Sequence, residues 1–175
     1  IYMKIKFSKR SISKKCLIDI SKVIRSGWLT HGKYTKLFEE KFRIFTNSKY
    51  SLTVSSCTAG LHLSCLAAGF KNGDEVIVPA MTHTATAHAV EYTGAKVIFC
   101  DVCPNTGNLT IENIKKKYSK KTKGVVLVHM NGKPCNLDKI KKFCNKKKIR
   151  IIEDCAHALG TKYKNKHVGN FGLSG

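Results

Sequence analysis

The feature that most constrains the fold is a regular alternation between short apolar runs and segments with helical periodicity. Apolar residues spaced three and four apart indicate amphipathic helices, and short apolar runs bounded by turn residues indicate strands. Most predicted strands are apolar on both faces, as a parallel sheet covered by helices on both sides requires. The sequence therefore predicts an α/β fold with a mostly parallel sheet flanked by helices. The predicted strands span 50–55, 75–79, 96–101, 124–128 and 149–154, and the helices between them span 58–68, 84–92, 109–117 and 137–148.

Two helices are predicted ahead of this alternation. The first spans 11–26 and ends at Ser26-Gly27, and the second carries Leu37, Phe38, Phe42 and Phe45 at helical spacing and closes at Asn47. After the last predicted strand, a hairpin-like segment over 161–169 ends the recognisable pattern.

The composition fits one globular core. The chain has 175 residues, of which 42% are hydrophobic, and it holds 13 Gly and only 3 Pro, which excludes disordered and collagen-like classes. No stretch approaches the roughly 20 apolar residues of a membrane span, and the N-terminus lacks a secretory signal, so we expect a cytoplasmic protein. The sequence begins at Ile1 and stops at Gly175 in a Gly/Ser-rich run, so we expect it to be truncated at both ends.

The charge is strongly positive. Thirty-two Lys and Arg residues face 11 Asp and Glu, for a formal net charge of +21, which suggests a polyanionic partner. However, 28 of the basic residues are Lys and only 4 are Arg, whereas readers of bases and phosphates favour the bidentate Arg fork. A non-catalytic polyanion-binding protein stays as an alternative, and nucleic acid is not the expected partner.

The eight cysteines are scattered through predicted strands and helices, which favours reduced thiols over a disulfide framework. Cys100-x-x-Cys103 has no second CxxC and no nearby His pair, so we expect no metal site.

Ligands of parallel α/β sheets bind beyond the carboxyl ends of the strands, so the residues after each predicted strand are candidates for chemistry. Ser55-Ser56-Cys57-Thr58-Ala59-Gly60 opens a predicted helix, where hydroxyl groups and free backbone N–H groups suit a phosphate. An ordinary Ser/Thr helix cap explains this segment equally well. No GxxxxGK[ST] and no GxGxxG pattern occurs, so ATP and dinucleotide phosphate loops are not supported.

A second polar group follows the last predicted strand. Glu153, Asp154 and His157 place two carboxylates and an imidazole at the strand exit, where we expect them to enter the same crevice. A carboxylate there can hold a protonated ring nitrogen or a metal, or can cap the next helix. Two further imidazoles, those of His129 and His83, also follow predicted strands.

Four segments carry a family resemblance. They are the runs 55–62 (SSCTAGLH), 73–79 (GDEVIVP), 94–102 (GAKVIFCDV) and 151–160 (IIEDCAHALG). In this order and spacing they resemble the DegT/DnrJ/StrS family, whose members are pyridoxal-phosphate (PLP)-dependent nucleotide-sugar aminotransferases. The resemblance runs from Trp28 to Gly169 and implies the N-terminal part of the large domain of fold type I aminotransferases.

The resemblance assigns expected roles around PLP. Asp154 matches the aspartate that pairs with the pyridinium nitrogen. Cys57 and Thr58 match the segment that holds the cofactor phosphate, although the family usually has Gly in place of Cys57. His83 falls where an aromatic residue stacks on the ring, and His157 falls near the ring's phenolic oxygen.

The resemblance also implies a division of the chain and a missing catalytic group. Thr30 and Gly32 match a motif near the sugar-nucleotide site, so we expect a substrate-site segment over 1–32 and an incomplete PLP-binding domain over 33–175. The family's Schiff-base lysine lies beyond the position of Gly175, so we expect no catalytic lysine in this sequence and no transaminase activity from it alone.

The expected reaction of the parent enzyme is amino transfer, with glutamate as the expected donor, to a keto carbon of a nucleotide-activated deoxysugar. The resemblance implies a homodimer that acts in the biosynthesis of a surface polysaccharide such as lipopolysaccharide. The segment 134–138 (PCNLD) is most similar to the branch that acts on UDP-4-keto-hexosamines. The alternative within the family is a PLP-dependent sugar dehydratase, which carries histidine in place of the lysine.

Overall fold

The structure of the protein, a computed structural model, describes residues 11–175. Its long helices are α1 (Lys14–Arg25), α2 (Lys33–Thr46), α3 (Cys57–Ala67), α4 (Thr84–Glu91), α5 (Ile111–Lys117) and α6 (Leu137–Lys147), with a short 3-10 turn η1 (Met130–Gly132). Its strands are β1 (Glu75–Pro79), β2 (Lys96–Cys100), β3 (Thr122–Val128) and β4 (Arg150–Asp154), followed by a small pair, β5 (Lys162–Tyr163) and β6 (Lys166–His167).

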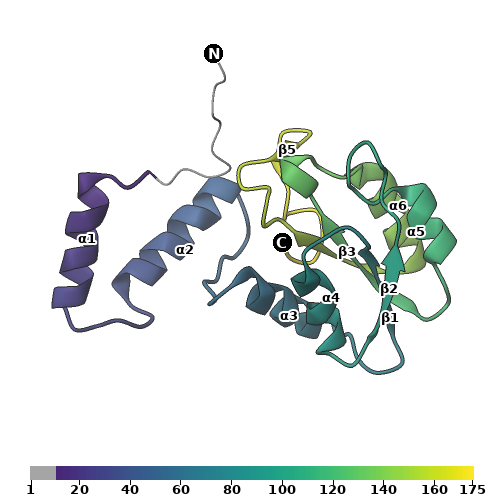
Figure 1. The fold of residues 1–175 in the computed structure, drawn as a ribbon, viewed down its shortest axis with the longest axis horizontal. Helices are drawn as coiled ribbons and strands as arrows, with labels where there is room; N and C mark the ends of the chain where they lie inside the picture. Colours follow the sequence, from purple (N-terminus) through teal and green to yellow (C-terminus); the bar gives the residue numbers. More distant parts are fainter. Residues whose placement is uncertain (1–10) are drawn as a thin grey trace, which may run out of the picture.

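The four longer strands form one parallel sheet in the order β2-β1-β3-β4. Helices α3 and α4 pack on one face and helices α5 and α6 on the other, which gives three layers (Figure 1). The predicted α/β class and parallel sheet are therefore confirmed. Because all four strands run the same way, their carboxyl ends meet at one edge, where the sequence predicted the site.

The two faces of the sheet each bury an apolar cluster. Val76, Val78, Val126 and Ile152 face α3 and α4, while the alternate positions of the same strands face α5 and α6. Gly124 is required on β3, since a Cβ there would lie 2.1 Å from the ring atom Cζ of Phe70. This tight packing fixes the positions of the strand ends that carry the polar residues.

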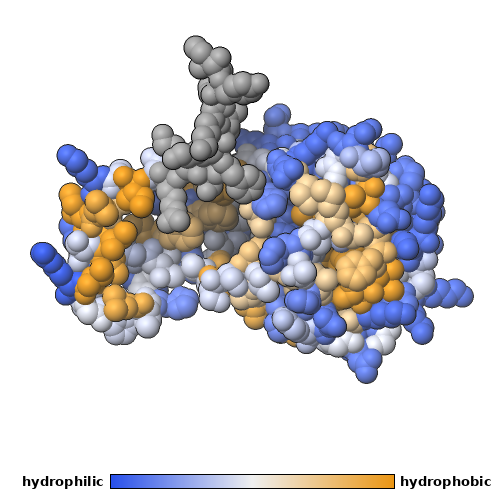
Figure 2. All heavy atoms as spheres, in the orientation of Figure 1, coloured by the Kyte–Doolittle hydropathy of each residue, from blue (hydrophilic) through white to orange (hydrophobic). Residues whose placement is uncertain are grey.

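Helices α1 and α2 lie to one side of the three layers (Figure 1) and bury no residue of their own. Ser13 caps α1, and Asn47 closes α2 in the left-handed conformation, as the sequence pattern predicted. Apolar side chains of this part are exposed, and Figure 2 shows them gathered over α1. They include Leu17, Ile20, Ile24, Trp28, Leu29 and Phe38.

The strand predicted over 50–55 is wrong. These residues are irregular and pair with no strand among the residues described, and Leu52 is 82% exposed. A strand is held by ladder hydrogen bonds to a neighbour, so an apolar run without one stays irregular. The remaining strands and helices are confirmed within a few residues, including the hairpin of β5 and β6.

Three further predictions concern the cysteines, membrane spans and the division of the chain. All eight cysteines are free thiols in the described chain, which confirms the expected absence of a disulfide framework. Within residues 11–175, none of the helices has the length and apolar character needed to cross a membrane. The division at residue 32 stays a prediction, and residues 1–10 of its first part lie outside the described residues.

Candidate functional site

Asp154 is the last residue of β4, and its carboxylate is almost fully buried at the carboxyl edge of the sheet. It faces α3 and α4, because it lies on the same side of β4 as Ile152, which packs in the cluster under those helices. Its Oδ1 accepts the backbone N–H of Ala156 at 3.2 Å. A buried carboxylate with few protein partners is suited to a cationic ligand group.

Helix α3 begins beside this carboxylate. Ser56 caps the helix, its Oγ accepting the N–H of Ala59 at 3.1 Å, so the capping alternative for this segment is confirmed. The backbone N–H groups of Cys57 and Thr58 find no acceptor in the described part of the chain. A cap and a free anion-binding turn therefore coexist at the start of α3.

The side chain of Cys57 connects the start of α3 with the Asp154 carboxylate. Its Sγ lies 3.9 Å from Oδ1 of Asp154, which brings the start of α3 against the end of β4. Partial burial and the charge of Asp154 raise the pKa of the Cys57 thiol. The thiol is therefore protonated at neutral pH and can act as a weak donor to the carboxylate.

Two threonines at this site had no role in the sequence prediction. Oγ1 of Thr86, fully buried in α4, donates to Oδ2 of Asp154 at 2.9 Å, and Thr82 Oγ1 lies 2.8 Å from Thr86 Oγ1. A usable signal existed, because Thr86 shares the buried stripe of α4 with Ala89 and Val90. A hydroxyl inside an apolar stripe must find a polar partner.

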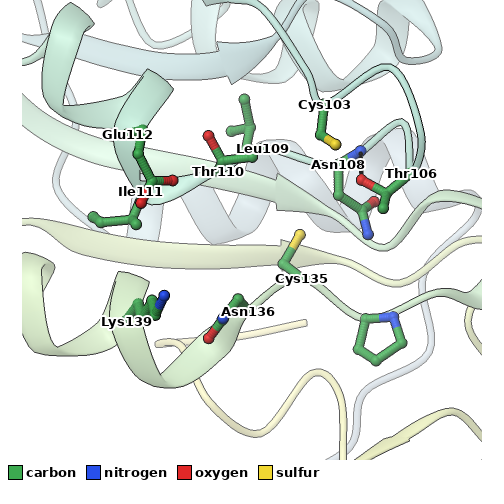
Figure 3. A pocket seen from close by; sticks show the side chains of 11 residues that line it. Cys103, Thr106, Asn108, Leu109, Thr110, Ile111, Glu112, Cys135, Asn136 and Lys139 are labelled. Atoms are coloured by element: carbon green, nitrogen blue, oxygen red, sulfur yellow. Dashed lines mark hydrogen bonds between the residues drawn. The ribbon is translucent and has the colours of Figure 1, made fainter.

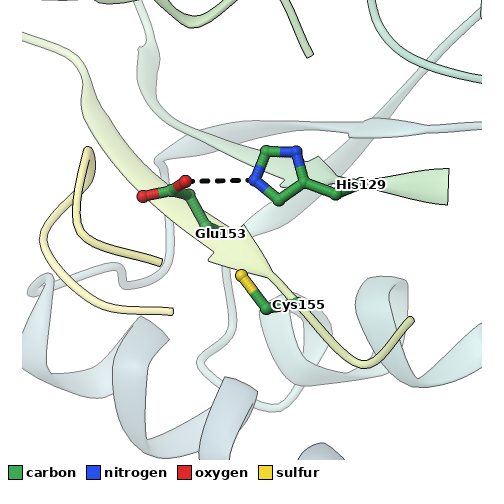
Figure 4. A group of neighbouring side chains, drawn as sticks. All are labelled: His129, Glu153 and Cys155. Carbon is green, nitrogen blue, oxygen red and sulfur yellow. Dashed lines mark hydrogen bonds and ion pairs between the residues drawn. The ribbon is translucent and has the colours of Figure 1, made fainter. Parts of the chain in front are cut away.

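Glu153 does not enter the crevice with Asp154, so that part of the prediction is wrong. Neighbouring residues of a strand point to opposite faces, and Glu153 faces the α5 and α6 side. Its carboxylate accepts the backbone N–H groups of Gly169, Phe171 and Gly172 at 2.9, 2.6 and 2.7 Å, and the ring of His129 lies 3.0 Å away (Figure 4).

These contacts set the ionisation of Glu153. Burial raises its pKa, but the hydrogen bonds from His129 and from the three backbone N–H groups outweigh burial, so the pKa lies below its ordinary value. The carboxylate is therefore charged at neutral pH and ties the segment 169–172 to β4. Its role in the fold is structural, and it is not free to act on a ligand.

His129, Glu153 and Cys155 lie close enough to suggest a metal site (Figure 4), but their hydrogen bonds do not fit one. His129 Nδ1 accepts the N–H of Cys135 at 3.2 Å, so the ring proton is on Nε2, which donates to Glu153. A protonated nitrogen is not a ligand, and both oxygens of Glu153 already accept N–H groups. Burial also raises the pKa of the Cys155 thiol strongly, which disfavours the thiolate that a metal needs.

The two other predicted cofactor residues, His83 and His157, are exposed near the same edge. His83 caps α4, its Nδ1 accepting the N–H of Ala85 at 3.1 Å, so its ring is held at the start of the helix that carries Thr86. His157 follows β4 in a turn, and no contact among the described residues joins it to Asp154. Neither ring is buried against the carboxylate.

Thr30 and Gly32 lie in the loop between α1 and α2. The ring of Trp28 covers Gly32 so closely that a Cβ there would lie 2.6 Å from its Cδ1, and Trp28 Nε1 donates to the carbonyl of His31 at 3.0 Å. The loop is thus shaped by Trp28. None of the described contacts brings Thr30 or Gly32 to Asp154.

A separate cavity of about 250 Å³ lies on the α5 and α6 side of the sheet (Figure 3). Cys103 lies on one wall and Cys135 on the other, and Asn108 at its edge is already bonded to the carbonyl of Lys133 at 2.8 Å. The cavity does not include Asp154 or the start of α3. The candidate site is therefore the open edge beside Asp154 and not this cavity.

The groups beside Asp154 suit a ligand that carries both a positive and a negative charge. A buried carboxylate attracts a cationic ring nitrogen, and the free N–H groups at the start of α3 attract an anion. A small molecule that carries both a basic ring nitrogen and a phosphate fits these two features together. PLP has this structure.

Comparison with known proteins decides the family. Residues 10–175 match the sequence profile of the DegT/DnrJ/EryC1/StrS aminotransferase family. The chain belongs to this family. A curated relative, the GDP-perosamine synthase of Escherichia coli O157:H7, is 41% identical over 154 residues, which cover 87% of this chain and 42% of the relative. The chain thus spans less than half the length of that DegT-family enzyme.

Solved structures agree with this assignment. A Streptococcus pneumoniae protein described as a sugar aminotransferase, in its PLP form, matches with a TM-score of 0.91 and 29% identity over 97% of this chain and 47% of its own. A GDP-4-keto-6-deoxymannose-3-dehydratase with a trapped PLP-glutamate geminal diamine matches with a TM-score of 0.89 and 32% identity, over 97% and 46%. The parallel sheet and its helices are thus those of PLP enzymes of the DegT family.

Proposed function

We propose that the chain forms the cofactor-binding part of a PLP-dependent nucleotide-sugar aminotransferase. The observation that carries this proposal is the buried carboxylate of Asp154, held within 3.9 Å of the Cys57 sulfur at the start of α3. When bound, PLP supplies an electron sink for the carbon that gains or loses the amino group. Asp154 holds the proton on the ring nitrogen that this chemistry requires.

The other residues of the site position the cofactor in this proposal. The N–H groups of Cys57 and Thr58, with the Thr58 hydroxyl, bind the phosphate at the start of α3. His83 is placed by its capping contact at the start of α4 and stacks on the ring. His157 lies near the phenolic oxygen, and Thr30 and Gly32 contact the substrate.

The relatives bear on the substrate of the whole enzyme. The similarity to a GDP-perosamine synthase favours a GDP-linked sugar over the UDP-linked hexosamine suggested by residues 134–138. Glutamate is the proposed amino donor, and a surface polysaccharide is the proposed destination of the amino sugar. The eight free thiols suit a cytoplasmic enzyme.

A dehydratase remains the second candidate function. It is favoured by one observation, the match to the GDP-4-keto-6-deoxymannose-3-dehydratase at 32% identity. In this proposal the ring-nitrogen and phosphate contacts at the Asp154 site serve either reaction. The non-catalytic polyanion-binding alternative explains the charge of +21 but not the buried Asp154.

The proposed homodimer rests on the apolar surface of the N-terminal helices. Leu17, Ile20 and Ile24 are each more than half exposed on one side of α1. Exposed apolar patches of this kind mark interaction surfaces. A second copy of the chain is the proposed partner.

The test of cofactor binding uses pyridoxamine 5′-phosphate (PMP), since PLP would form Schiff bases with many of the 28 lysines. We expect calorimetric titration of the full chain to give saturable binding with one PMP per chain. Asp154→Asn keeps the side-chain shape but removes the charge, and we expect about tenfold weaker binding. Asp101→Asn, at the exit of β2, is the matched control and should leave the affinity unchanged. Equal affinity of the Asp154→Asn variant would contradict the proposal.

A further inference from the structure

A buried pair of hydroxyl groups supports Asp154 from the side of α4. Thr86 is fully buried, and its Oγ1 lies 2.9 Å from Oδ2 of Asp154. Thr82, one turn earlier, places its own Oγ1 2.8 Å from Thr86 Oγ1. The three groups form a chain from the loop after β1 to the end of β4.

The direction of the hydrogen bonds in this chain follows from the charge of Asp154. An ionised carboxylate only accepts, so Thr86 must donate its single proton to Asp154. Thr86 can then only accept from its neighbour, so Thr82 donates to Thr86. Each bond polarises the next, so the two hydroxyl groups direct their protons along the chain toward the carboxylate.

The contact also fixes the orientation of the carboxylate. Oδ2 is held by Thr86 from α4, and Oδ1 is held by the N–H of Ala156 from the turn after β4. The Cys57 thiol is a second, weaker partner of Oδ1 at 3.9 Å. With partners on both oxygens, the carboxyl group cannot rotate freely about its last bond. The orientation of the Asp154 carboxylate is therefore set before a ligand arrives.

We propose that Thr86, supported by Thr82, is a positioning residue that holds the Asp154 carboxylate oriented toward the cofactor's ring nitrogen. This inference rests on the proposed function, because it assigns the task of Asp154 to a cationic ring. The Thr86 hydroxyl is bonded only to Asp154 and Thr82 among the polar groups described, so it acts through the carboxylate and not on the ligand.

The test compares Thr86→Val, Thr86→Ser and Thr82→Val in PMP titrations of the full chain. Valine keeps the shape of threonine without the hydroxyl, so we expect Thr86→Val to weaken binding about tenfold and Thr82→Val about threefold. Thr86→Ser keeps the hydroxyl and should bind within about twofold of the unaltered chain. Equal losses for Thr86→Ser and Thr86→Val would indicate a packing role and overturn the inference.

A ligand analogue separates positioning from packing. In the analogue of PMP with C–H in place of the ring nitrogen, Asp154 has no cation to hold. We expect the Thr86→Val effect to vanish with this analogue, and an undiminished effect would overturn the inference. Failure of the unaltered chain to bind PMP would overturn the proposed function and this inference with it, whereas binding unchanged by Thr86→Val overturns the inference alone.

A second measurement needs no ligand. In urea unfolding of the chain without cofactor, we compare the shift in midpoint of the double variant Thr86→Val/Asp154→Asn with those of the two single variants. The double variant should shift by less than the sum of the single shifts, because both substitutions change the same hydrogen bond. Strict additivity would overturn the inference.

Discussion

At the scale of single residues, Glu153 and Asp154 are neighbours on one strand, but their carboxylates lie on opposite faces of the sheet and have different roles. Glu153 is surrounded by four N–H donors on the α5 and α6 side. Asp154 faces the other side with fewer partners, so it keeps capacity for a ligand. Sequence adjacency therefore does not make the two acids a catalytic pair.

Glu153→Gln should destabilise the chain by about 3 kcal/mol, because an amide cannot accept all of the N–H groups that the buried carboxylate accepts. The pKa of Glu153 is lowered in the folded chain, so its charge stabilises the fold above its ordinary pKa near 4.5, and this stability is lost as the pH falls below it. Urea unfolding from pH 7 to pH 3 measures both effects.

The control for this prediction is Asp138→Asn, since Asp138 is exposed and pairs with Lys164. We expect little change in the free energy of unfolding from that variant. A Glu153→Gln variant as stable as the unaltered chain at pH 7 would show that the segment 169–172 is held by other contacts.

The cysteines should fall into two classes of reactivity. Hydrogen bonds from Ser13 and from Thr106 lower the pKa of Cys16 and Cys103, whereas burial raises the pKa of Cys135 to about 12 and of Cys65 to about 11. A lower pKa gives more thiolate at pH 7, so Cys16 and Cys103 should react first with a disulfide reagent. Mass mapping of short reactions measures the order, with the urea-unfolded chain as control. Early labelling of Cys57 would contradict the contact with Asp154.

At the scale of elements, the first turn of α3 contributes both to the stability of the fold and to the proposed binding of PMP. Ser56→Ala removes the cap and should cost about 1 kcal/mol of stability. It should also weaken PMP binding several-fold, because the frayed turn no longer holds the N–H groups of Cys57 and Thr58 in place. Calorimetry and urea unfolding give the two values.

Thr110→Ala is the matched control, because Thr110 caps α5 with the same type of contact at 3.2 Å. We expect a similar loss of stability and no change in PMP affinity. Equal loss of affinity in both variants would mean that general stability, and not the first turn of α3, governs binding.

The elements also show what sequence patterns can predict. Strands such as 75–79 and 96–100 were predictable because β-branched runs between turn residues have few alternatives in a buried sheet. The run 50–55 alternates apolar and hydroxyl residues as a strand can, but it lacks a neighbouring strand, and a sequence pattern does not reveal this. Asp154 was predictable as a strand exit, whereas Thr86 was missed because its bond to Asp154 joins residues 68 positions apart.

At the scale of the whole molecule, exposed apolar surface and positive charge act in opposite directions. The charge of +21 repels a second copy, while the apolar side of α1 favours one. Added salt screens the repulsion without weakening apolar contact. We therefore expect self-association to strengthen as salt rises.

Ile20→Glu should weaken this association, because it places a charge within the apolar side of α1. Sedimentation velocity at several salt concentrations measures the dimer fraction. Lys15→Gln changes the net charge by the same amount from the polar side of α1 and should keep the dimer. A dimer fraction unaffected by Ile20→Glu would place the interface elsewhere.

The most direct measurement is a crystal structure of the chain with PMP. We predict that the ring nitrogen lies within hydrogen-bonding distance of the Asp154 carboxylate, with the phosphate on the N–H groups of Cys57 and Thr58. A ring nitrogen turned away from Asp154, or PMP bound instead in the cavity between α5 and α6, would contradict the proposed cofactor site.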